Sequence, residues 1–307
     1  MISNKLKAYN KSIRSSNVYD VAEVTPITQA NTLSKDLKNN IFLKREDLQP
    51  IFSFKVRGAY NKLSKIKKNG TSSSVIAASA GNHAQGVAYS AKRLGLKSII
   101  VMPITTPLIK INAVKNFGGK VMLFGDNFDE AFEHAISLAN KENYSFIHPY
   151  DDKDVISGQG TIGKEILEQT ESKVEAVFVP VGGGGLLAGV GAYIKSEHPE
   201  IKVIGVEPDD AACLDLAIKN NKRLSLKEVG LFADGVAVKQ IGKLTFSIIR
   251  EWLDDVVTVS VDEMCAAVQD TFQETRTIPE PAGALALAGL KKYTKSKGLK
   301  NKNLIAI

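Results

Sequence analysis

From about Ser74 onward, short apolar runs alternate with longer stretches of mixed polarity. Apolar runs of about four to eight residues are typical of buried strands, and amphipathic stretches are typical of helices that cover them. The pattern predicts strands at 75–78, 98–102, 120–124, 144–148, 174–181, 201–206 and 303–307. It predicts helices at 83–94, 107–117, 128–141 and 161–168, and another from 185 onward. Such an alternation indicates βαβ units, and therefore an α/β fold with parallel sheets covered on both faces.

Two polar segments indicate a domain division. The charged segment 64–74 and the loop 148–152 resemble two crossings of one boundary. We therefore expect a small inserted domain at 74–151, and a large domain made of 1–73 and 152–307. Because ligand sites of open α/β folds lie beyond the carboxyl ends of strands, the candidate motifs should face one cleft.

Composition narrows the function classes. The 307 residues are 44% hydrophobic and carry a net charge of +7, but the lysines are scattered without interleaved aromatic residues, so we expect no nucleic-acid partner. No apolar run approaches the roughly 20 residues of a membrane span, and the polar N-terminus lacks a signal peptide. Cys213 and Cys265 are too few and too far apart for a disulfide framework or a zinc site. We expect a cytoplasmic protein.

The first candidate for chemistry is Lys55, in the stretch Ser53-Phe54-Lys55-Val56-Arg57-Gly58. A lysine between Phe54 and Val56 is partly desolvated, which disfavours the ammonium form. A neutral amine can form a Schiff base with an aldehyde such as that of pyridoxal phosphate. Most lysines are solvated surface charges, so this stretch alone does not decide between the two interpretations.

The second candidate is the run Gly182-Gly183-Gly184-Gly185, between an apolar strand and an apolar helix. Without Cβ atoms, backbone N–H groups can close on a phosphate, and the helix N-terminus adds its positive end. A nucleotide P-loop is excluded because the GK[ST] ending is missing. The run predicts a phosphate cradle.

Ser79-Ala80-Gly81-Asn82-His83 also follows a strand and begins a helix. Its hydroxyl, amide and N–H groups are suited to holding a carboxylate and a phenolic oxygen. Ordinary helix capping by Ser79 or Asn82 explains the same residues equally well. A third glycine-rich stretch, 158–163, matches GxGxxG, but it follows a polar loop and lacks the later acidic residue, so we expect no nicotinamide cofactor.

Four segments together resemble one family: 52–59, 79–86, 182–185 and 280–284. In this order they are similar to the threonine dehydratase (threonine ammonia-lyase) and serine racemase group of fold-type II pyridoxal phosphate enzymes. The likeness runs from Val18 to Ile307. Its first segment, residues 19–26, is most similar to the biosynthetic threonine dehydratases. It implies two open, twisted, mostly parallel sheets flanked by helices, as in the tryptophan synthase β fold. It also implies pyridoxal 5'-phosphate as cofactor, and conversion of L-threonine to 2-oxobutanoate and ammonia, or of L-serine to pyruvate, in isoleucine biosynthesis.

The resemblance implies a role for each matching residue. Lys55 would hold the cofactor and move protons at the substrate Cα. The other expected cofactor-binding residues are Phe54, Asn82, Gly182, Gly183, Gly184, Gly185, Leu186, Gly235 and Glu280. The expected substrate-binding residues are Ser79, Ala80, Gly81, Asn82 and His83. The family also implies a homo-oligomer, a dimer or tetramer.

Two departures from the family define the alternatives. Ala80 stands where serine racemases carry a proton-donating serine, which disfavours the alternative of a serine/threonine racemase. At the racemases' cation site Glu207 and Ala211 match, but Cys213 replaces an aspartate, so we expect no metal.

The sequence also stops at Ile307, before a family turn whose hydroxyl meets the cofactor ring, and before the regulatory domain of the biosynthetic members. A truncated, inactive protein with the same fold is therefore the second alternative.

Overall fold

The computed structural model describes residues 3–170 and 173–307, and the chain forms two compact units. Unit 1 comprises Met1–Arg14, Thr25–Glu46 and Gly160–Ile307, and unit 2 comprises Ser15–Val24 and Asp47–Gln159. Residues 47–73 therefore cluster with unit 2, although the sequence pattern assigned them to the large domain. The functional division into a cofactor-binding and an inserted domain remains a prediction.

Unit 1 is built on a six-stranded sheet with the order β1-β2-β10-β7-β8-β9. Only the first pair, β1 and β2, is antiparallel, and every other neighbouring pair is parallel. The carboxyl ends of five strands therefore lie along the same edge of the sheet. The strands are β1 (Ile27–Gln29), β2 (Asn40–Lys44), β7 (Ala176–Pro180), β8 (Lys202–Pro208), β9 (Asp255–Val259) and β10 (Asn303–Ala306).

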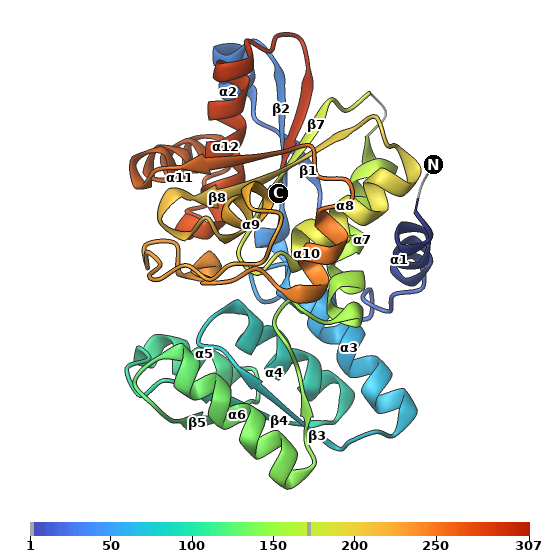
Figure 1. Ribbon diagram of the computed structural model, residues 1–307, viewed down its shortest axis with the longest axis vertical. Helices are drawn as coiled ribbons and strands as arrows, with labels where there is room; N and C mark the ends of the chain where they lie inside the picture. Colours follow the sequence, from blue (N-terminus) through green and yellow to red (C-terminus); the bar gives the residue numbers. More distant parts are fainter. Residues whose placement is uncertain (1–2, 171–172) are drawn as a thin grey trace. The chain divides into compact units, whose positions relative to one another are not determined.

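Helices cover both faces of this sheet, with α11 and α12 on one face and α8 and α10 on the other (Figure 1). The helices of unit 1 are α1 (Asn4–Arg14), α2 (Asn31–Leu37), α8 (Gly185–Glu197), α9 (Cys213–Lys219), α10 (Lys243–Ile249), α11 (Val261–Thr275) and α12 (Pro281–Lys297), with 3-10 turns η2 (Asp209–Ala211) and η3 (Asp234–Val236). Among the described residues, none of the helices is both long and apolar enough to cross a membrane.

Unit 2 is built on a parallel four-stranded sheet with the order β5-β4-β3-β6. Its strands are β3 (Ser74–Ala78), β4 (Lys97–Met102), β5 (Lys120–Leu123) and β6 (Ser145–Phe146), and its helices are α3 (Lys55–Asn69), α4 (Asn82–Leu94), α5 (Leu108–Asn116) and α6 (Phe128–Glu142). Strand residues alternate between faces: Val75 and Ala77 join the core that contains α3 and α4, and Ile76 and Ala78 join the core that contains α6. Burial on both faces explains why β3 is apolar throughout.

The predicted α/β class with two mostly parallel sheets is confirmed. One predicted helix was wrong in extent: α7 spans Lys153–Gln169, whereas the pattern placed a helix only at 161–168. Gly158 and Gly160, which lie before the predicted helix, are inside α7 together with Gly163. The first residues of α7 belong to unit 2 and the others to unit 1.

These glycines allow close packing of helices. A Cβ atom on Gly158 would lie 2.7 Å from the carbonyl oxygen of Arg57 in α3, and one on Gly163 would lie 2.9 Å from the carbonyl oxygen of Val190 in α8. On Gly160, a Cβ atom would lie 2.6 Å from Ile13 Cδ1 in α1. Real Cβ atoms do not approach other atoms so closely. The glycines of the GxGxxG spacing therefore serve the packing of helices within each unit.

Candidate functional site

Lys55 is the first residue of α3, directly after a tight turn at residues 51–54. In that turn Phe52 has φ of 57°, a left-handed conformation that is uncommon for a non-glycine residue. Lys55 is half-buried, and its Nζ lies 5.1 Å from the ring centroid of Phe54. The turn thus presents the amine beside an aromatic face. The expected contact of Phe54 with the cofactor remains a prediction.

The α4 helix passes close to the backbone of Lys55. A Cβ atom on Gly86 would lie 3.1 Å from the Lys55 carbonyl oxygen, so glycine permits this approach. Since α4 begins at Asn82, the helix that supports Lys55 also carries the predicted amide ligand. Unit 2 therefore brings the lysine motif and the asparagine motif together.

The loop between β3 and α4 contains Ser79, Ala80 and Gly81, all half-exposed. The Ser79 backbone N–H donates to the Val101 carbonyl at 3.2 Å, and the Ser79 hydroxyl accepts a hydrogen bond from the Gly81 N–H at 3.2 Å. These bonds fix the loop at the carboxyl end of β3. Its assignment to substrate binding remains a prediction.

His83, in the first turn of α4, is buried, and its Nε2 lies 2.9 Å from the Ile147 carbonyl oxygen. Because a carbonyl only accepts, Nε2 must carry the proton. Burial, and to a lesser extent the positive charge of the nearby Lys55, lower the pKa of His83 to about 3. The imidazole is therefore neutral at physiological pH, and it fixes the start of α4 against the end of β6.

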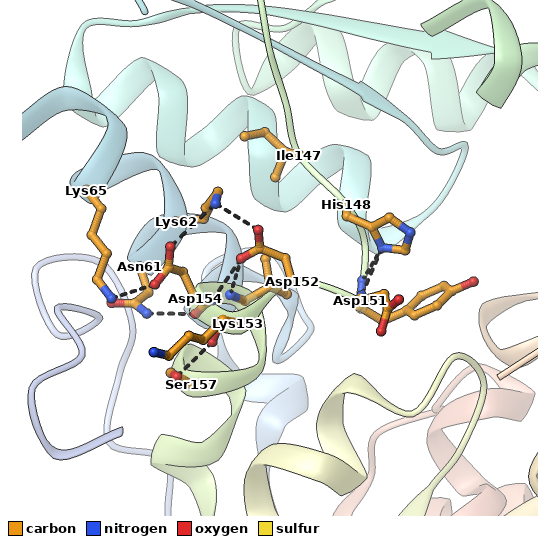
Figure 2. A network of polar contacts seen from close by, with 12 residues as sticks. Asn61, Lys62, Lys65, Ile147, His148, Asp151, Asp152, Lys153, Asp154 and Ser157 are labelled. Carbon is orange, nitrogen blue, oxygen red and sulfur yellow. Dashed lines mark hydrogen bonds and ion pairs between the residues drawn. The ribbon is translucent and has the colours of Figure 1, made fainter. Parts of the chain in front are cut away.

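A second histidine near Lys55 was not identified from the sequence. Burial lowers the pKa of His148, and the positive charge of Lys55 acts in the same direction, against the opposing effect of Asp151 and Asp152. Its Nδ1 accepts hydrogen bonds from the backbone N–H groups of Asp151 at 2.9 Å and Tyr150 at 3.3 Å (Figure 2). In the sequence it is only the last residue of a predicted strand, and the segment 148–152 was interpreted as a domain boundary.

The segment after His148 is held by a cluster of charged residues at the start of α7. Lys62 of α3 lies 2.7 Å from Asp152, and Lys65 lies 2.6 Å from Asp154 (Figure 2). The Asn61 side chain donates to the Asp154 backbone carbonyl at 2.7 Å. These contacts fix the loop that carries His148 to the helix that begins with Lys55.

In unit 1, the four glycines form the turn between β7 and α8 at the carboxyl edge of the sheet. Gly184 has φ of 87°, a conformation that side chains disfavour. Gly183, Gly184, Gly185 and Leu186 are buried. Within the described residues, the backbone N–H groups of Gly183 and Gly184 have no hydrogen-bond acceptor, and those of Gly185 and Leu186 begin a helix.

Buried N–H groups without an acceptor are rare in proteins, because leaving them unpaired costs free energy. An anion bound at the turn would supply the missing acceptors, and the N-terminal end of α8 would attract its negative charge. The turn therefore fits a phosphate group such as that of pyridoxal phosphate.

The other predicted cofactor residues of unit 1 lie around the same turn. A Cβ atom on Gly182 would lie 3.0 Å from Val236 Cα, and one on Gly235 would lie 3.3 Å from Glu280 Oε1. Glu280 precedes α12 as its N-cap residue. The structure thus brings Gly182, Gly235 and Glu280 together from three segments that are distant in the sequence.

Glu207, at the racemase cation position, is buried with its carboxyl oxygens directed at the start of α9. They accept hydrogen bonds from the backbone N–H groups of Leu214 and Asp215, each at 2.8 Å. Burial raises the pKa of Glu207 to about 7, and burial also raises the pKa of the adjacent Cys213 thiol. Across the described residues, no group of three or more acidic, histidine or cysteine side chains is arranged to bind a metal ion.

Comparisons with known proteins show which family the chain is similar to. The family profile of pyridoxal-phosphate dependent enzymes matches residues 18–307. A biosynthetic L-threonine dehydratase of Pasteurella multocida is 55% identical over 299 residues, which cover 97% of this chain and 58% of that protein. The chain thus spans less than two thirds of the length of this relative.

Two solved structures are similar over nearly the whole chain. The processed form of threonine deaminase isoform 2 from Solanum lycopersicum has a TM-score of 0.97 and 48% identity, covering 99% of this chain and 84% of that one. Serine racemase from Dictyostelium discoideum has a TM-score of 0.87 and 31% identity, covering 98% of this chain and 96% of that one.

Proposed function

This chain belongs to the family of pyridoxal-phosphate dependent enzymes, and on that premise we propose that it deaminates L-threonine to 2-oxobutanoate and ammonia. L-serine, which lacks only a methyl group, would give pyruvate by the same chemistry. The observation that carries the proposal is the turn at Gly183 and Gly184, whose buried N–H groups have no acceptor of their own. Unit 2 by itself carries a half-buried amine, that of Lys55, beside the ring of Phe54.

The residues of the chain would act in distinct ways. Bound pyridoxal phosphate supplies a conjugated ring that accepts the electron pair left when the Cα–H bond breaks. Lys55 would hold the cofactor through Nζ and, as a free amine, would accept the Cα proton. Asn82 binds the ring hydroxyl, and the backbone N–H groups near Ser79 and His83 bind the substrate carboxylate.

Loss of the β-hydroxyl as water and hydrolysis of the released enamine then give the 2-oxo acid and ammonium. The net change is neither oxidation nor reduction, so the reaction needs no second cofactor. His83 suits this scheme, because its Nε2–H is hydrogen-bonded to the Ile147 carbonyl and its low pKa makes it too weak a base to compete with Lys55 for the Cα proton.

Racemisation needs a second proton carrier on the opposite face of the substrate from Lys55. Ala80 occupies the loop between β3 and α4 where such a carrier would stand, and its methyl group holds no proton. Elimination is therefore favoured over the alternative activity of a serine/threonine racemase.

The remaining features follow from the same assignment. The enzyme would act in isoleucine biosynthesis, in the cytoplasm, as a homo-oligomer of two or four chains. Residues 1–73 and 152–307 would form the cofactor-binding domain, and residues 74–151 the small inserted domain.

The test is to incubate the purified chain with pyridoxal phosphate and L-threonine and to measure 2-oxobutanoate. Lys55→Ala should lower the rate by at least about 100-fold, because it removes the proton acceptor and the covalent attachment. Borohydride reduction of the wild type should attach the cofactor irreversibly to Lys55, as mass spectrometry of the peptides would reveal.

The matched control is Lys68→Ala, which removes an exposed lysine from the same helix and should leave the rate unchanged. Cofactor bound at Lys55 without keto acid production would indicate a binding protein that retains the fold. D-serine formed from L-serine would support the racemase instead.

A further inference from the structure

Side chains outside the four motifs hold the carbonyl groups of the tetraglycine turn. The Gly183 carbonyl oxygen accepts a hydrogen bond from the Thr245 hydroxyl at 2.8 Å and another from the Gly242 N–H at 3.3 Å. The preceding carbonyl, that of Gly182, lies 3.6 Å from Cys213 Sγ. Both carbonyls are therefore directed at the segment that carries α9 and α10.

The direction of a carbonyl fixes the direction of the next N–H group. In a planar trans peptide, the C=O of one residue and the N–H of the next point in opposite directions. Because the Gly183 carbonyl points at Thr245, the Gly184 N–H points away from α10. The same relation turns the Gly183 N–H away from Cys213.

Glycine gives this turn its shape but leaves it free to adopt others, since glycine has the widest choice of backbone conformation. A run of four glycines therefore needs restraint from its surroundings. The segment 241–249, which includes α10, supplies a packed wall: a Cβ atom on Gly184 would lie 2.7 Å from Ile241 Cδ1 and 3.1 Å from Thr245 Cβ. On this wall, Thr245 provides the side-chain donor to Gly183.

The Thr245 hydroxyl is fully buried, and its partner lies 62 residues away in the sequence. A threonine in the first turn of a helix commonly satisfies its own helix, whereas this hydroxyl reaches a different element. The hydrogen bond therefore does more than satisfy a buried polar atom of α10: it couples α10 to the turn.

We propose that Thr245 is a positioning residue for phosphate binding. By holding the Gly183 carbonyl, it keeps the N–H group of Gly184 directed at the phosphate of the cofactor. This inference rests on the proposed function, because it takes pyridoxal phosphate as the ligand of the turn. The Thr245 hydroxyl should therefore affect the affinity only for ligands that carry the phosphate.

The test compares the affinities of the full chain for pyridoxal phosphate and for pyridoxal, which lacks the phosphate, by equilibrium dialysis. Thr245→Val keeps the shape of the side chain and removes the hydroxyl. It should weaken pyridoxal phosphate binding by about three- to tenfold, because one net hydrogen bond is lost while the Gly242 N–H bond remains. Pyridoxal binding should stay within about twofold of the wild type.

Thr294→Val is the matched control, because the Thr294 hydroxyl is buried in α12 without a hydrogen-bond partner in the described part of the chain. It should leave both affinities unchanged. If Thr245→Val does not fold, Thr245→Ser and Thr245→Ala make the same comparison, since both lack the methyl group and only alanine lacks the hydroxyl. Thr245→Ser should retain the ratio of the affinities for pyridoxal phosphate and pyridoxal, and Thr245→Ala should lower this ratio by about three- to tenfold.

Equal weakening of both ligands, or no weakening of either, would overturn the role of Thr245. A wild-type chain that binds pyridoxal phosphate no better than pyridoxal would instead overturn the assignment of the turn, and with it the proposed function. The two failures are therefore distinguishable in one set of measurements.

Discussion

Neutral His83 illustrates how burial sets the charge of a single side chain. With its pKa lowered to about 3 from 6.5, it stays unprotonated in the folded chain over a range in which an unfolded chain would bind a proton. Between these two values the unfolded state binds more protons than the folded state. Stability therefore falls as the pH decreases from about 6.5 towards about 3.

We predict that His83→Gln removes this contribution, because glutamine can donate to the Ile147 carbonyl without titrating. As the pH decreases from about 6.5 towards about 3, the free energy of unfolding of the wild type should fall relative to that of the variant by about 1.4 kcal/mol per pH unit. Urea unfolding followed by circular dichroism at several pH values measures this difference.

Comparison with a variant is needed because Glu207 acts in the opposite direction. Its pKa is raised by burial from 4.5 to about 7, so its contribution to stability falls as the pH rises through that range. His198→Gln is the control, since it replaces an exposed histidine and leaves His83 in place, so the difference from His83→Gln should persist in this variant. Parallel curves for the wild type and His83→Gln would contradict the neutral state of His83.

At the scale of elements, contact between α3 and α7 depends on paired glycines within unit 2. The Gly58 N–H donates to Gln159 Oε1 at 3.1 Å, and a Cβ atom on Gly58 would lie 2.5 Å from Gln159 Nε2. A Cβ atom on Gly158 would lie 2.7 Å from Gly58 Cα. The backbones of the two helices are thus in direct contact beside the first turn of α3, which carries Lys55.

Gly158→Ala should therefore destabilise unit 2 by about 1–3 kcal/mol, because the added methyl group meets backbone atoms that cannot move aside. A decrease in the midpoint of thermal unfolding, with a matching decrease in urea, measures this change. Gly283→Ala is the matched control: it also lies in a helix, but its Cβ atom would have no contact closer than 3.4 Å. There alanine should be neutral or stabilising by up to about 1 kcal/mol.

At the scale of the whole molecule, the sheet of unit 1 is assembled from segments at opposite ends of the chain. Strand β10 lies between β2 and β7, so Ile305 pairs with Phe42 on one side and with Val177 on the other. A buried ion pair reinforces the N-terminal segment: Lys44 Nζ lies 2.6 Å from Glu165 Oε2, with both side chains almost fully buried. Gln169 also accepts a hydrogen bond from the ammonium group, at 3.0 Å.

Lys44→Met should cost about 3–5 kcal/mol in the free energy of unfolding, because it leaves the Glu165 carboxylate buried without its cation. The double variant Lys44→Met/Glu165→Leu should recover most of this loss, since it removes both charges. Denaturant unfolding of the wild type, the single variant and the double variant measures how much stability depends on the pairing of Lys44 with Glu165.

Lys219→Met is the comparison, because Lys219 pairs with Asp215 on the surface, with 71% of the lysine side chain exposed. Its replacement should cost less than about 1 kcal/mol. A similarly small cost for Lys44→Met would show that the buried pair contributes little.

The sequence by itself determined the fold class and the candidate motifs. Runs such as 75–78 and 176–180 are apolar on both faces, as in parallel strands that are covered on both sides, and Gly182–Gly185 between a strand and a helix predicts an anion cradle. The sequence could not determine where α7 begins, because Gly158 and Gly160 weaken a helix locally and are favoured there only by neighbouring helices.

Only the tertiary structure decided which distant residues support the motifs. Neither His148 near Lys55 nor Thr245 on the Gly183 carbonyl carries a local signal, since an isolated histidine or threonine in a sequence is ordinary. Their roles arise from burial and from the approach of elements that the chain connects only at long range. Local patterns specify each element, whereas protonation states and hydrogen-bond partners are set by packing.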